Sequence, residues 1–435
     1  MPREFAGAPQ FDDVLRSTAR VLDCIRVGGS ETRQQIGDLV DLGKAVVSER
    51  VRALQAAGVV VEEGQLASGG GRPAKRLRFA AELGYVIAVE VAVTHLRISA
   101  ADLAGVVGWT EHWPYGMSLG PDVVLGELEN RLDDLVHDPQ RRGDGVLCGI
   151  GVGVAAPVEF ATGRVVFPPV HPEWHDQPIR DRLSGRYCVP TWVDNEVNLM
   201  AQGEFRAGLA KGERDIIFVK LGTGIGAGLI SSGRLHRGHL GCAGDIGHVA
   251  VAEGSGVICR CGNEGCLEAL AGGTALARDA RAAAEAGRSP YLAHVLESGA
   301  NVEAVDVGRA AQNGDGAAVE LIVRSGRLIG ETLATLVNFF NPSLLILGGG
   351  VANLGDLLLA AIRETVYRRS APLATRELRI TRSPLDCEAG LLGGAFMVID
   401  ELFSRERLGL WLADGSPVGH PDIAETPAAF ASVGS

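Results

Sequence analysis

The sequence has 435 residues, of which 46% are hydrophobic and 22% are charged, so it can form two or three domains with apolar cores. It contains no stretch of about twenty apolar residues and no charged-then-apolar leader, and we therefore expect a cytoplasmic protein without a membrane span. A net charge of −12 argues against general coating of nucleic acid. The charge is uneven, because residues 64–79 hold basic side chains and no acidic one, which predicts one local anion-binding module.

Residues 11–80 predict a winged helix-turn-helix domain. Apolar residues recur at helical spacing over 11–27, 32–40 and 43–57, and we expect Ile36 and Leu39 to face inward in the second helix. The turn between the last two helices is short, as in helix-turn-helix proteins. Two strand-like segments, 59–61 and 76–79, flank a glycine-rich stretch, and this pattern predicts a two-stranded wing.

The third helix and the tip of the wing are the expected DNA contacts. On the helix face away from the core, the polar residues that could reach the major groove are Lys44, Ser48, Arg50 and Arg52. Arg72 lies between glycines and a proline at the wing tip, and a guanidinium there suits a narrow minor groove. The alternative interpretation is a small packing or dimerisation domain with a solvated basic loop.

From residue 83 onward, strands and helices alternate. Strands are expected at 85–91, 96–100, 145–154, 215–220 and 343–347, and helices at 273–286 and 326–338. Glycine turns end several of these strands, which predicts two α/β lobes with a ligand cleft between them. We place this domain at 84–407. We expect residues 408–435, which are rich in glycine, alanine and proline, to form a loosely ordered tail.

One imidazole and three thiols lie close together in a glycine-rich stretch: His248, Cys259, Cys261 and Cys266. This set predicts a closed, tetrahedral, structural Zn²⁺ site. The alternative is a group of buried thiols, or a disulfide, in a loop that also contains a histidine. Asp245 and Glu268 flank the set, and their carboxylates would be held rigidly enough near the metal to grip a polar ligand.

Taken in order, these motifs resemble the ROK family, which comprises repressors, open-reading-frame proteins and sugar kinases. The motifs are the winged helix with its Gly-Gly-Arg-Pro tip, residues 193–198, the glycine turn 222–226, residues 244–248 and the cysteine knuckle. The resemblance implies an actin-like fold of two lobes, as in sugar-kinase-type ATPases, with a zinc-held sugar pocket and usually a homo-oligomer. Its sugar contacts fall on Asn195, Glu196, Asp245, His248 and Glu268.

Departures from the family pattern suggest that catalysis is lost. Kinases of the family need paired glycines in the first hairpin so that backbone N–H groups approach the phosphates, but Val93 stands in place of one. The family's base is an aspartate, whereas Glu196 is one methylene longer and would be misplaced. The family's Gly-Glu before the zinc histidine is likewise shortened to Asp245. We therefore expect no ATP, no catalytic residue and no enzyme activity.

The leading interpretation is a sugar-responsive transcriptional regulator of carbohydrate-metabolism genes, a repressor of the NagC/XylR type. It would bind a double-stranded DNA operator as a homodimer or homotetramer and respond to a sugar or sugar phosphate. Two alternatives stay open. One is an ATP-dependent sugar kinase with an appended DNA-binding domain, and the other is a ligand-independent DNA-binding regulator with a vestigial pocket.

Overall fold

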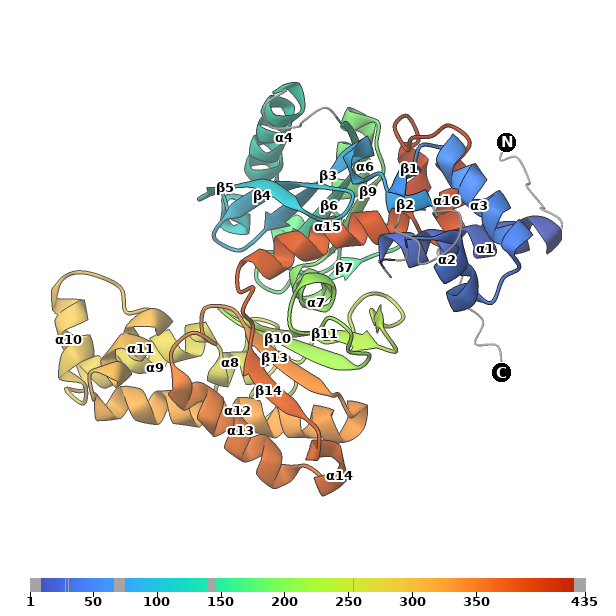
Figure 1. The fold of residues 1–435 in the computed structure, drawn as a ribbon. Coiled ribbons are helices and arrows are strands. Elements are labelled where there is room, and N and C mark those ends of the chain that lie inside the picture. The colour runs from blue at the N-terminus through green and yellow to red at the C-terminus, as the bar shows by residue number, and fades with distance from the viewer. Residues whose placement is uncertain are drawn as a thin grey trace.

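The computed structural model describes residues 9–27, 29, 31–65, 75–138, 145–252 and 254–425. They form an N-terminal module (residues 9–79) and two α/β lobes, and the module packs against lobe 1 at one end of the molecule (Figure 1). None of the helices in these ranges is long and apolar enough to cross a membrane.

The N-terminal module is a winged helix-turn-helix. Its elements are α1 (Pro9–Arg26), α2 (Arg33–Val40), α3 (Lys44–Ala56), β1 (Val60–Gln65) and β2 (Lys75–Phe79). Thr32 caps α2 in a capping box with Gln35, and Asp41 ends α2 in the left-handed conformation. The inward position expected for Leu39 is wrong, because its side chain is 66% exposed. The next residue, Val40, is buried instead.

Lobe 1 contains a mixed sheet in the order β5-β4-β3-β6-β9. Its strands are β3 (Gly84–Val91), β4 (Leu96–Asp102), β5 (Val107–Trp113), β6 (Val146–Val154) and β9 (Thr191–Asn195). Side chains alternate along β3, so that Ile87 and Val89 share a core with α4 (Pro121–His137) and α6 (Ile179–Tyr187). Val86 and Ala88 face the opposite side. A short hairpin, β7 (Val158–Glu159) and β8 (Arg164–Val165), follows β6.

Lobe 2 repeats this topology with the order β12-β11-β10-β13-β14. Its strands are β10 (Ile216–Leu221), β11 (Ile225–Ser231), β12 (Arg234–Leu235), β13 (Leu344–Gly348) and β14 (Arg379–Arg382). Its helices are α8 (Leu267–Ala271), α9 (Gly273–Glu285), α10 (Pro290–Glu297), α11 (Ala304–Gln312), α12 (Gly316–Phe340), α13 (Asp356–Arg369) and α14 (Pro372–Thr375). In both sheets, three antiparallel strands are followed by two parallel ones, which is the actin-like arrangement expected from the resemblance.

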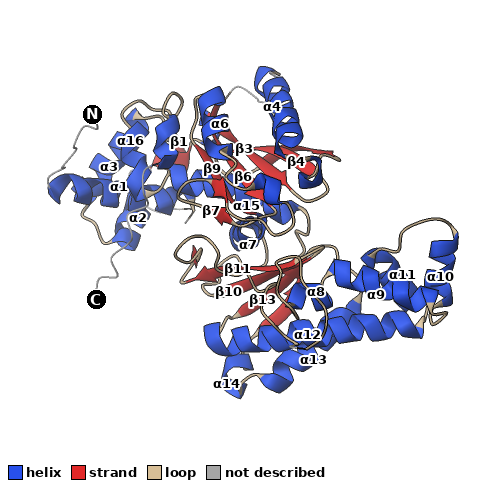
Figure 2. Ribbon diagram, turned by 180° about the vertical axis from the view of Figure 1, so that it is seen from behind, coloured by secondary structure: helices blue, strands red, loops and turns tan. Residues whose placement is uncertain are grey.

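Two helices, α7 (Glu196–Ala207) and α15 (Glu388–Leu402), lie between the lobes (Figure 2). One face of α7 shares a core with the lobe 2 sheet, and α15 packs on the lobe 1 sheet through Val86 and Ala88. The two helices also contact each other directly. A Cβ at Gly203 would overlap the carbonyl of Ala389, and one at Gly393 would overlap the carbonyl of Leu199, so glycine permits this close approach.

The C-terminal segment is ordered, which corrects the expected loose tail for residues 408–425. Helix α16 (Arg405–Trp411) and the 3₁₀ turn η4 (Pro421–Glu425) bring Leu408, Trp411 and Ile423 into one core with the N-terminal module. Residues 426–435 lie outside the described residues. Composition misled here because the apolar partner of this segment is at the opposite end of the sequence. Three further 3₁₀ turns are η1 (Ala81–Leu83), η2 (Met117–Leu119) and η3 (Pro172–Trp174).

Candidate metal centre and interlobe site

The four residues of the expected zinc set converge between β12 and α8. One ligand atom from each of His248, Cys259, Cys261 and Cys266 lies within 4.8 Å of all the others. Nδ1 of His248 is 3.6 Å from Sγ of Cys259, and the Sγ atoms of Cys261 and Cys266 are 3.7 Å apart. Ordinary Zn–S and Zn–N bonds at tetrahedral angles give separations of about 3.8 Å between two sulfurs and about 3.6 Å between sulfur and nitrogen. The donor set therefore fits tetrahedral Zn²⁺.

Tight backbone turns hold the three thiols in place. Gly262 and Gly265 have φ of 90° and 73°, a region that favours glycine, and a Cβ at Gly265 would also overlap the carbonyl of Ala252. The Cys259 amide donates to the carbonyl of Asn263 over 2.8 Å, which closes the knuckle. The glycine-rich stretch thus supplies the turns that bring the thiols together.

Beside the cluster, three of the expected sugar contacts are brought together. Nδ1 of His248 faces the thiols, while its Nε2 faces outward and lies 4.0 Å from Oδ1 of Asp245, whose side chain is 49% exposed. Glu268 follows Cys266 by two residues, in the first turn of α8. Its Oε2 accepts a hydrogen bond from the amide of Ile225 over 3.1 Å and thereby connects the knuckle to the glycine turn after β10.

Asn195 and Glu196, the other two expected contacts, lie where β9 passes into α7. Asn195 has a structural role, since its Oδ1 caps α7 by accepting from the Val197 amide and its Nδ2 donates to the carbonyl of Ala156, both over 2.9 Å. Glu196 is 7% exposed and forms an ion pair with Lys220 of β10. Oε2 of Glu196 is buried and has no hydrogen-bond partner among the described residues.

Lys220 belongs to a charged cluster that sequence reasoning missed. Glu90 of β3 lies opposite Arg97 of β4 and bonds to it over 3.2 Å, and Arg97 also bonds to Glu388 at the start of α15 over 2.8 Å. The signal was present in the sequence, because Lys220, Glu90 and Arg97 each interrupt a run of apolar residues. A buried charge in a strand usually has a partner, and here the partners come from neighbouring elements.

Burial shifts the pKa of two groups in and beside this cluster. Burial raises the pKa of Glu90, and the nearby Glu196 carboxylate raises it further. Burial also lowers the pKa of His95 to about 4, with His112 and Arg97 acting in the same direction. Val93, in the turn between β3 and β4, is partly buried and its carbonyl lies against Gly116. The turn of the first hairpin of lobe 1 is therefore packed against the loop that follows β5.

Asp194 is a second residue that the sequence reasoning passed over, although it lies in the same motif. It is fully buried, and its Oδ2 accepts from Arg237 over 2.7 Å while its Oδ1 accepts from Asn198 over 2.8 Å. The guanidinium of Arg237 stacks 3.7 Å from the ring centre of Phe160. This network fixes the start of α7 and with it the position of Glu196.

In the N-terminal module, the expected DNA-contacting residues separate into two groups. Lys44 and Arg52 are exposed on α3, and Ser48 is partly exposed between them. Arg50 is different, because its side chain is 11% exposed and donates to Ser17 of α1 over 2.8 Å. The structure thus corrects the prediction for Arg50, whose side chain contacts another helix of the module. Arg72 lies outside the described residues.

The basic side chains of β2 are also paired with nearby carboxylates. Lys75 pairs with Glu62, Arg76 with Glu31, and Arg78 with Glu63 and Glu82. Hydrogen bonds from Lys75 and then Arg33 lower the pKa of Glu62 to about 2. Residues 64–79 hold no acid, but carboxylates from outside this segment pair with the cations of β2.

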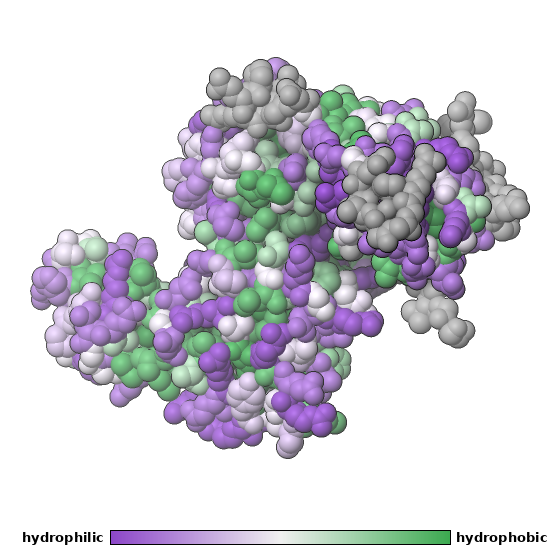
Figure 3. Space-filling view, viewed as in Figure 1, coloured by the Kyte–Doolittle hydropathy of each residue, from purple (hydrophilic) through white to green (hydrophobic). Residues whose placement is uncertain are grey.

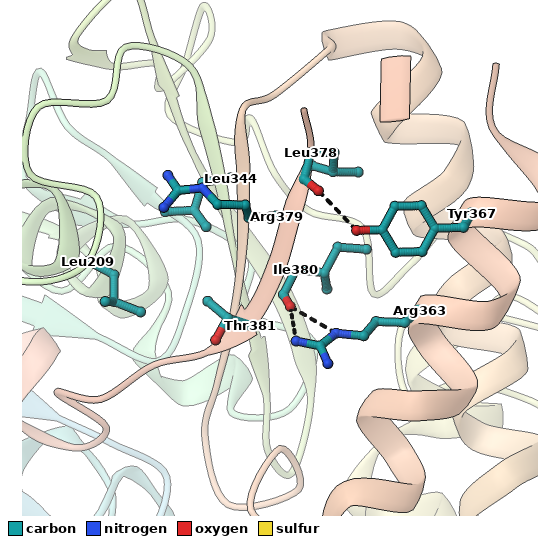
Figure 4. Close-up of a pocket in the computed structure, with 8 residues that line it drawn as sticks. All are labelled: Leu209, Leu344, Arg363, Tyr367, Leu378, Arg379, Ile380 and Thr381. Atoms are coloured by element: carbon teal, nitrogen blue, oxygen red, sulfur yellow. Dashed lines mark hydrogen bonds between the residues drawn. The ribbon is translucent and has the colours of Figure 1, made fainter. Parts of the chain in front are cut away.

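A hollow of about 520 Å³ lies at the edge strand β14, where Tyr367 and Arg363 of α13 donate to the carbonyls of Leu378 and Ile380 (Figure 4). It contains none of the expected sugar contacts. The space-filling view shows that the surface is also hollowed between lobe 1 and the α9–α11 end of lobe 2 (Figure 3).

Comparisons with known proteins agree with this arrangement. The ROK family profile matches residues 86–401. The xylose repressor of Caldicellulosiruptor bescii is 32% identical over 379 residues, which cover 86% of this chain and 92% of the repressor. A crystal structure of a ROK family transcriptional regulator, a homologue of the E. coli MLC protein, has a TM-score of 0.81 and 24% identity, and covers 93% of this chain and 100% of its own.

The similarity to a kinase covers only part of the chain. The ROK family glucokinase from Streptomyces griseus, solved with glucose and AMPPNP, has a TM-score of 0.63 and 29% identity, over 72% of this chain and 99% of its own. The similarity to the regulators therefore extends over more of the chain than the similarity to this kinase. The protein belongs to the ROK family, and its closer resemblance in length and architecture is to the transcriptional regulators of that family.

Proposed function

We propose that this ROK protein is a DNA-binding repressor of carbohydrate-metabolism genes that responds to a sugar bound between its lobes. The observation that carries the proposal is the winged helix-turn-helix packed on a two-lobed ROK domain, in a chain that aligns with a xylose repressor over 86% of its length. Lys44 and Arg52 are exposed on one face of α3 and supply the positive charge that DNA binding requires. A homodimer or homotetramer would present two such helices to two half-sites.

The sugar would bind beside the metal centre. Nε2 of His248 and the carboxylates of Asp245 and Glu268 offer hydrogen-bonding groups on one side, and Oε2 of Glu196 offers a buried acceptor on the other. Asn195 would contribute its remaining amide hydrogen. Zn²⁺ held by the Cys3His set supplies rigidity to the loop, and the ring of His248 is oriented by its Nδ1.

Phosphoryl transfer is not expected from this site. A general base must be free to accept a proton, but Glu196 is paired with the Lys220 ammonium. The turn that would receive phosphates holds Ala92 and Val93 in place of paired glycines. The sugar-kinase alternative is favoured by the likeness to the glucokinase, and a screen of hexoses and amino sugars with ATP decides it. Turnover that Glu196→Gln abolishes would establish the kinase.

Genome-wide binding of the intact protein tests the repressor proposal, because genes beside its sites would identify the pathway. Lys44→Ala and Arg52→Ala should each weaken binding, and each lost phosphate contact should lower the salt slope by about one. Arg72→Ala should cost about 1 to 3 kcal/mol, mostly at A·T-rich flanks. Arg368→Ala on α13 is the control, because it removes an equally exposed cation from lobe 2. Binding unchanged by all three N-terminal substitutions would refute the proposal.

A further inference from the structure

Asp400, in the last turn of α15, is bonded by side chains from two other parts of the chain. Arg26, the last residue of α1 in the N-terminal module, donates to Oδ1 of Asp400 over 3.1 and 3.2 Å. Arg206 of α7 donates to both carboxylate oxygens over 2.7 Å, and Gln202 of α7 donates to Oδ2 over 2.9 Å. One carboxylate therefore joins the N-terminal module to both helices that lie between the lobes.

This junction is shielded from water and packed against aromatic rings. The side chains of Arg26 and Arg206 are only 7% and 17% exposed. The guanidinium of Arg26 lies 5.5 Å from the ring centre of Phe403, and that of Arg206 lies 4.9 Å from the ring centre of Phe396. Charges placed in this way are weakly screened, and each arginine combines its bond to Asp400 with a contact to an aromatic ring.

Both interlobe helices connect the junction to the proposed sugar site. Helix α7 begins at Glu196 and carries Gln202 and Arg206 one turn apart on one face, about 15 Å further along at 1.5 Å per residue. Helix α15 begins at Glu388, which bonds to Arg97 in the charged cluster, and ends near Asp400. Figure 1 shows α15 running from the space between the lobes to the N-terminal module.

The packing of these helices makes them suitable for transmitting a displacement. Their backbones touch at Gly203 and Gly393, where even a methyl group would overlap a carbonyl of the other helix. No compressible side chain therefore separates the backbones at these points. Close-packed elements respond to a local shift by moving as a unit or by changing to a second arrangement.

We propose that Asp400 is the positioning residue through which sugar binding at the start of α7 changes the orientation of the N-terminal module, and hence its affinity for DNA. The inference rests on the proposed function. A sugar that draws Glu196 and the first turn of α7 toward the metal centre moves Arg206 at the other end of α7. Asp400 follows, and Arg26 must either move with it or lose the contact, so the two states differ in the geometry of this junction.

The test compares Asp400→Asn with Asp23→Asn. Both substitutions remove a carboxylate that bonds to Arg26. Asp23 bonds to Arg26 over 3.4 Å within α1, and among the described residues no hydrogen bond joins it to α7. The probe is a labelled duplex selected from a random library by the wild-type protein, titrated with and without D-xylose or D-glucose. We expect a sugar to change wild-type affinity about tenfold, Asp400→Asn to respond less than about twofold, and Asp23→Asn to respond fully. Arg206→Gln, which leaves the Arg26–Asp400 contact in place, should behave like Asp400→Asn.

A second measurement needs no ligand. Asn195→Ala removes the cap of α7, and it should change DNA affinity in the wild-type background but not together with Asp400→Asn. A normal sugar response in both Asp400→Asn and Arg206→Gln overturns the inference, as does an equal loss in Asp23→Asn. If neither sugar changes the DNA affinity of the wild type, the effector part of the proposed function fails. The comparison of Asn195→Ala with and without Asp400→Asn, which needs no ligand, then decides this inference alone. If the intact protein binds no duplex, both proposals fail.

Discussion

The same hairpin occurs once in each lobe, and the two copies close their turns differently. In lobe 2, the turn between β10 and β11 keeps Gly222 and Gly224, and the Gly222 carbonyl accepts from Gly273 at the start of α9. A Cβ at Gly224 would overlap the carboxylate of Glu268. In lobe 1, the turn between β3 and β4 contains Val93, and the glycine that permits the close approach is Gly116 of the neighbouring loop.

This difference shows why a preserved glycine turn is weak evidence for phosphate binding. Gly224 of lobe 2 is needed by the internal packing of Glu268 whether or not a nucleotide binds. In lobe 1, the turn holds Ala92 and Val93 at the corresponding positions, so the fold forms there without glycine. The residues of the lobe 1 turn therefore say more about phosphate binding than the glycine turn of lobe 2 does.

Removing the metal should have the largest effect and should affect lobe 2 alone. Cys266→Ser should lose about one Zn²⁺ per chain and destabilise the protein by at least about 4 kcal/mol, because metal binding and local folding are coupled. Elemental analysis and thermal unfolding measure the two effects. Cys242→Ser, at an exposed cysteine outside the set, is the control and should change neither. Hydrogen exchange should rise in residues 245–268 while β3 and β6 keep their protection, and a uniform rise would contradict an effect confined to lobe 2.

The second largest effect is expected from the ion pair between Glu196 and Lys220. Lys220→Met leaves Glu196 buried without its cation and should cost about 3 kcal/mol in the free energy of unfolding. Adding Glu196→Gln should recover at least half of that loss, because the unpaired charge is then gone. Urea unfolding of both variants measures the difference. Equal stability of the single and double variants would mean that the pair is already solvated.

Alanine substitutions at Gly116 and Gly224 test the packing around the turns of the two hairpins. Gly116→Ala in lobe 1 should cost about 2 kcal/mol, since the added methyl meets the backbone of Val93 and Thr94. Gly224→Ala in lobe 2 should cost about 1 kcal/mol, because only the end of the Glu268 side chain has to move. Gly126→Ala in the open middle of α4 is the control and should stabilise slightly. A reversed order of Gly116 and Gly224, measured by chemical unfolding, would refute the comparison.

The smallest effect is expected from His95, which follows β3 in lobe 1. Its pKa in the folded protein is lowered to about 4 by burial, below its ordinary value of 6.5. Its stabilising contribution is therefore complete above pH 6.5 and is lost as pH falls toward 4, because the unfolded chain binds the proton first. His95→Gln should flatten the stability profile in this window by about 1 kcal/mol, allowing for the partly exposed ring. His294→Gln, at an exposed histidine of α10, should leave the profile unchanged.

The sequence was sufficient wherever a local pattern determines the outcome. Helices and strands of the N-terminal module and of both sheets follow from apolar periodicity, and the zinc set follows from the spacing of its ligands. The sequence was insufficient where a partner distant in the chain decides whether a side chain is buried or paired. Leu39 and Val40 are both apolar at the end of α2, and only packing selects Val40. Arg50 points to α1 because Ser17 is there, and Glu196 is paired because the fold brings Lys220 to it.

The shared core of the N-terminal module and the C-terminal segment also has a consequence for synthesis. Leu22 and Val51 belong to the same core as Leu408 and Ile423, although nearly the whole chain separates them. At ordinary translation rates, the ribosome needs roughly 20 to 70 s to proceed from residue 80 to residue 425. Throughout that interval, the nascent module exposes an apolar face that only the last residues cover. A chain that ends prematurely before α16 would therefore carry an incomplete module with exposed apolar surface, which is a natural target for chaperones and proteases.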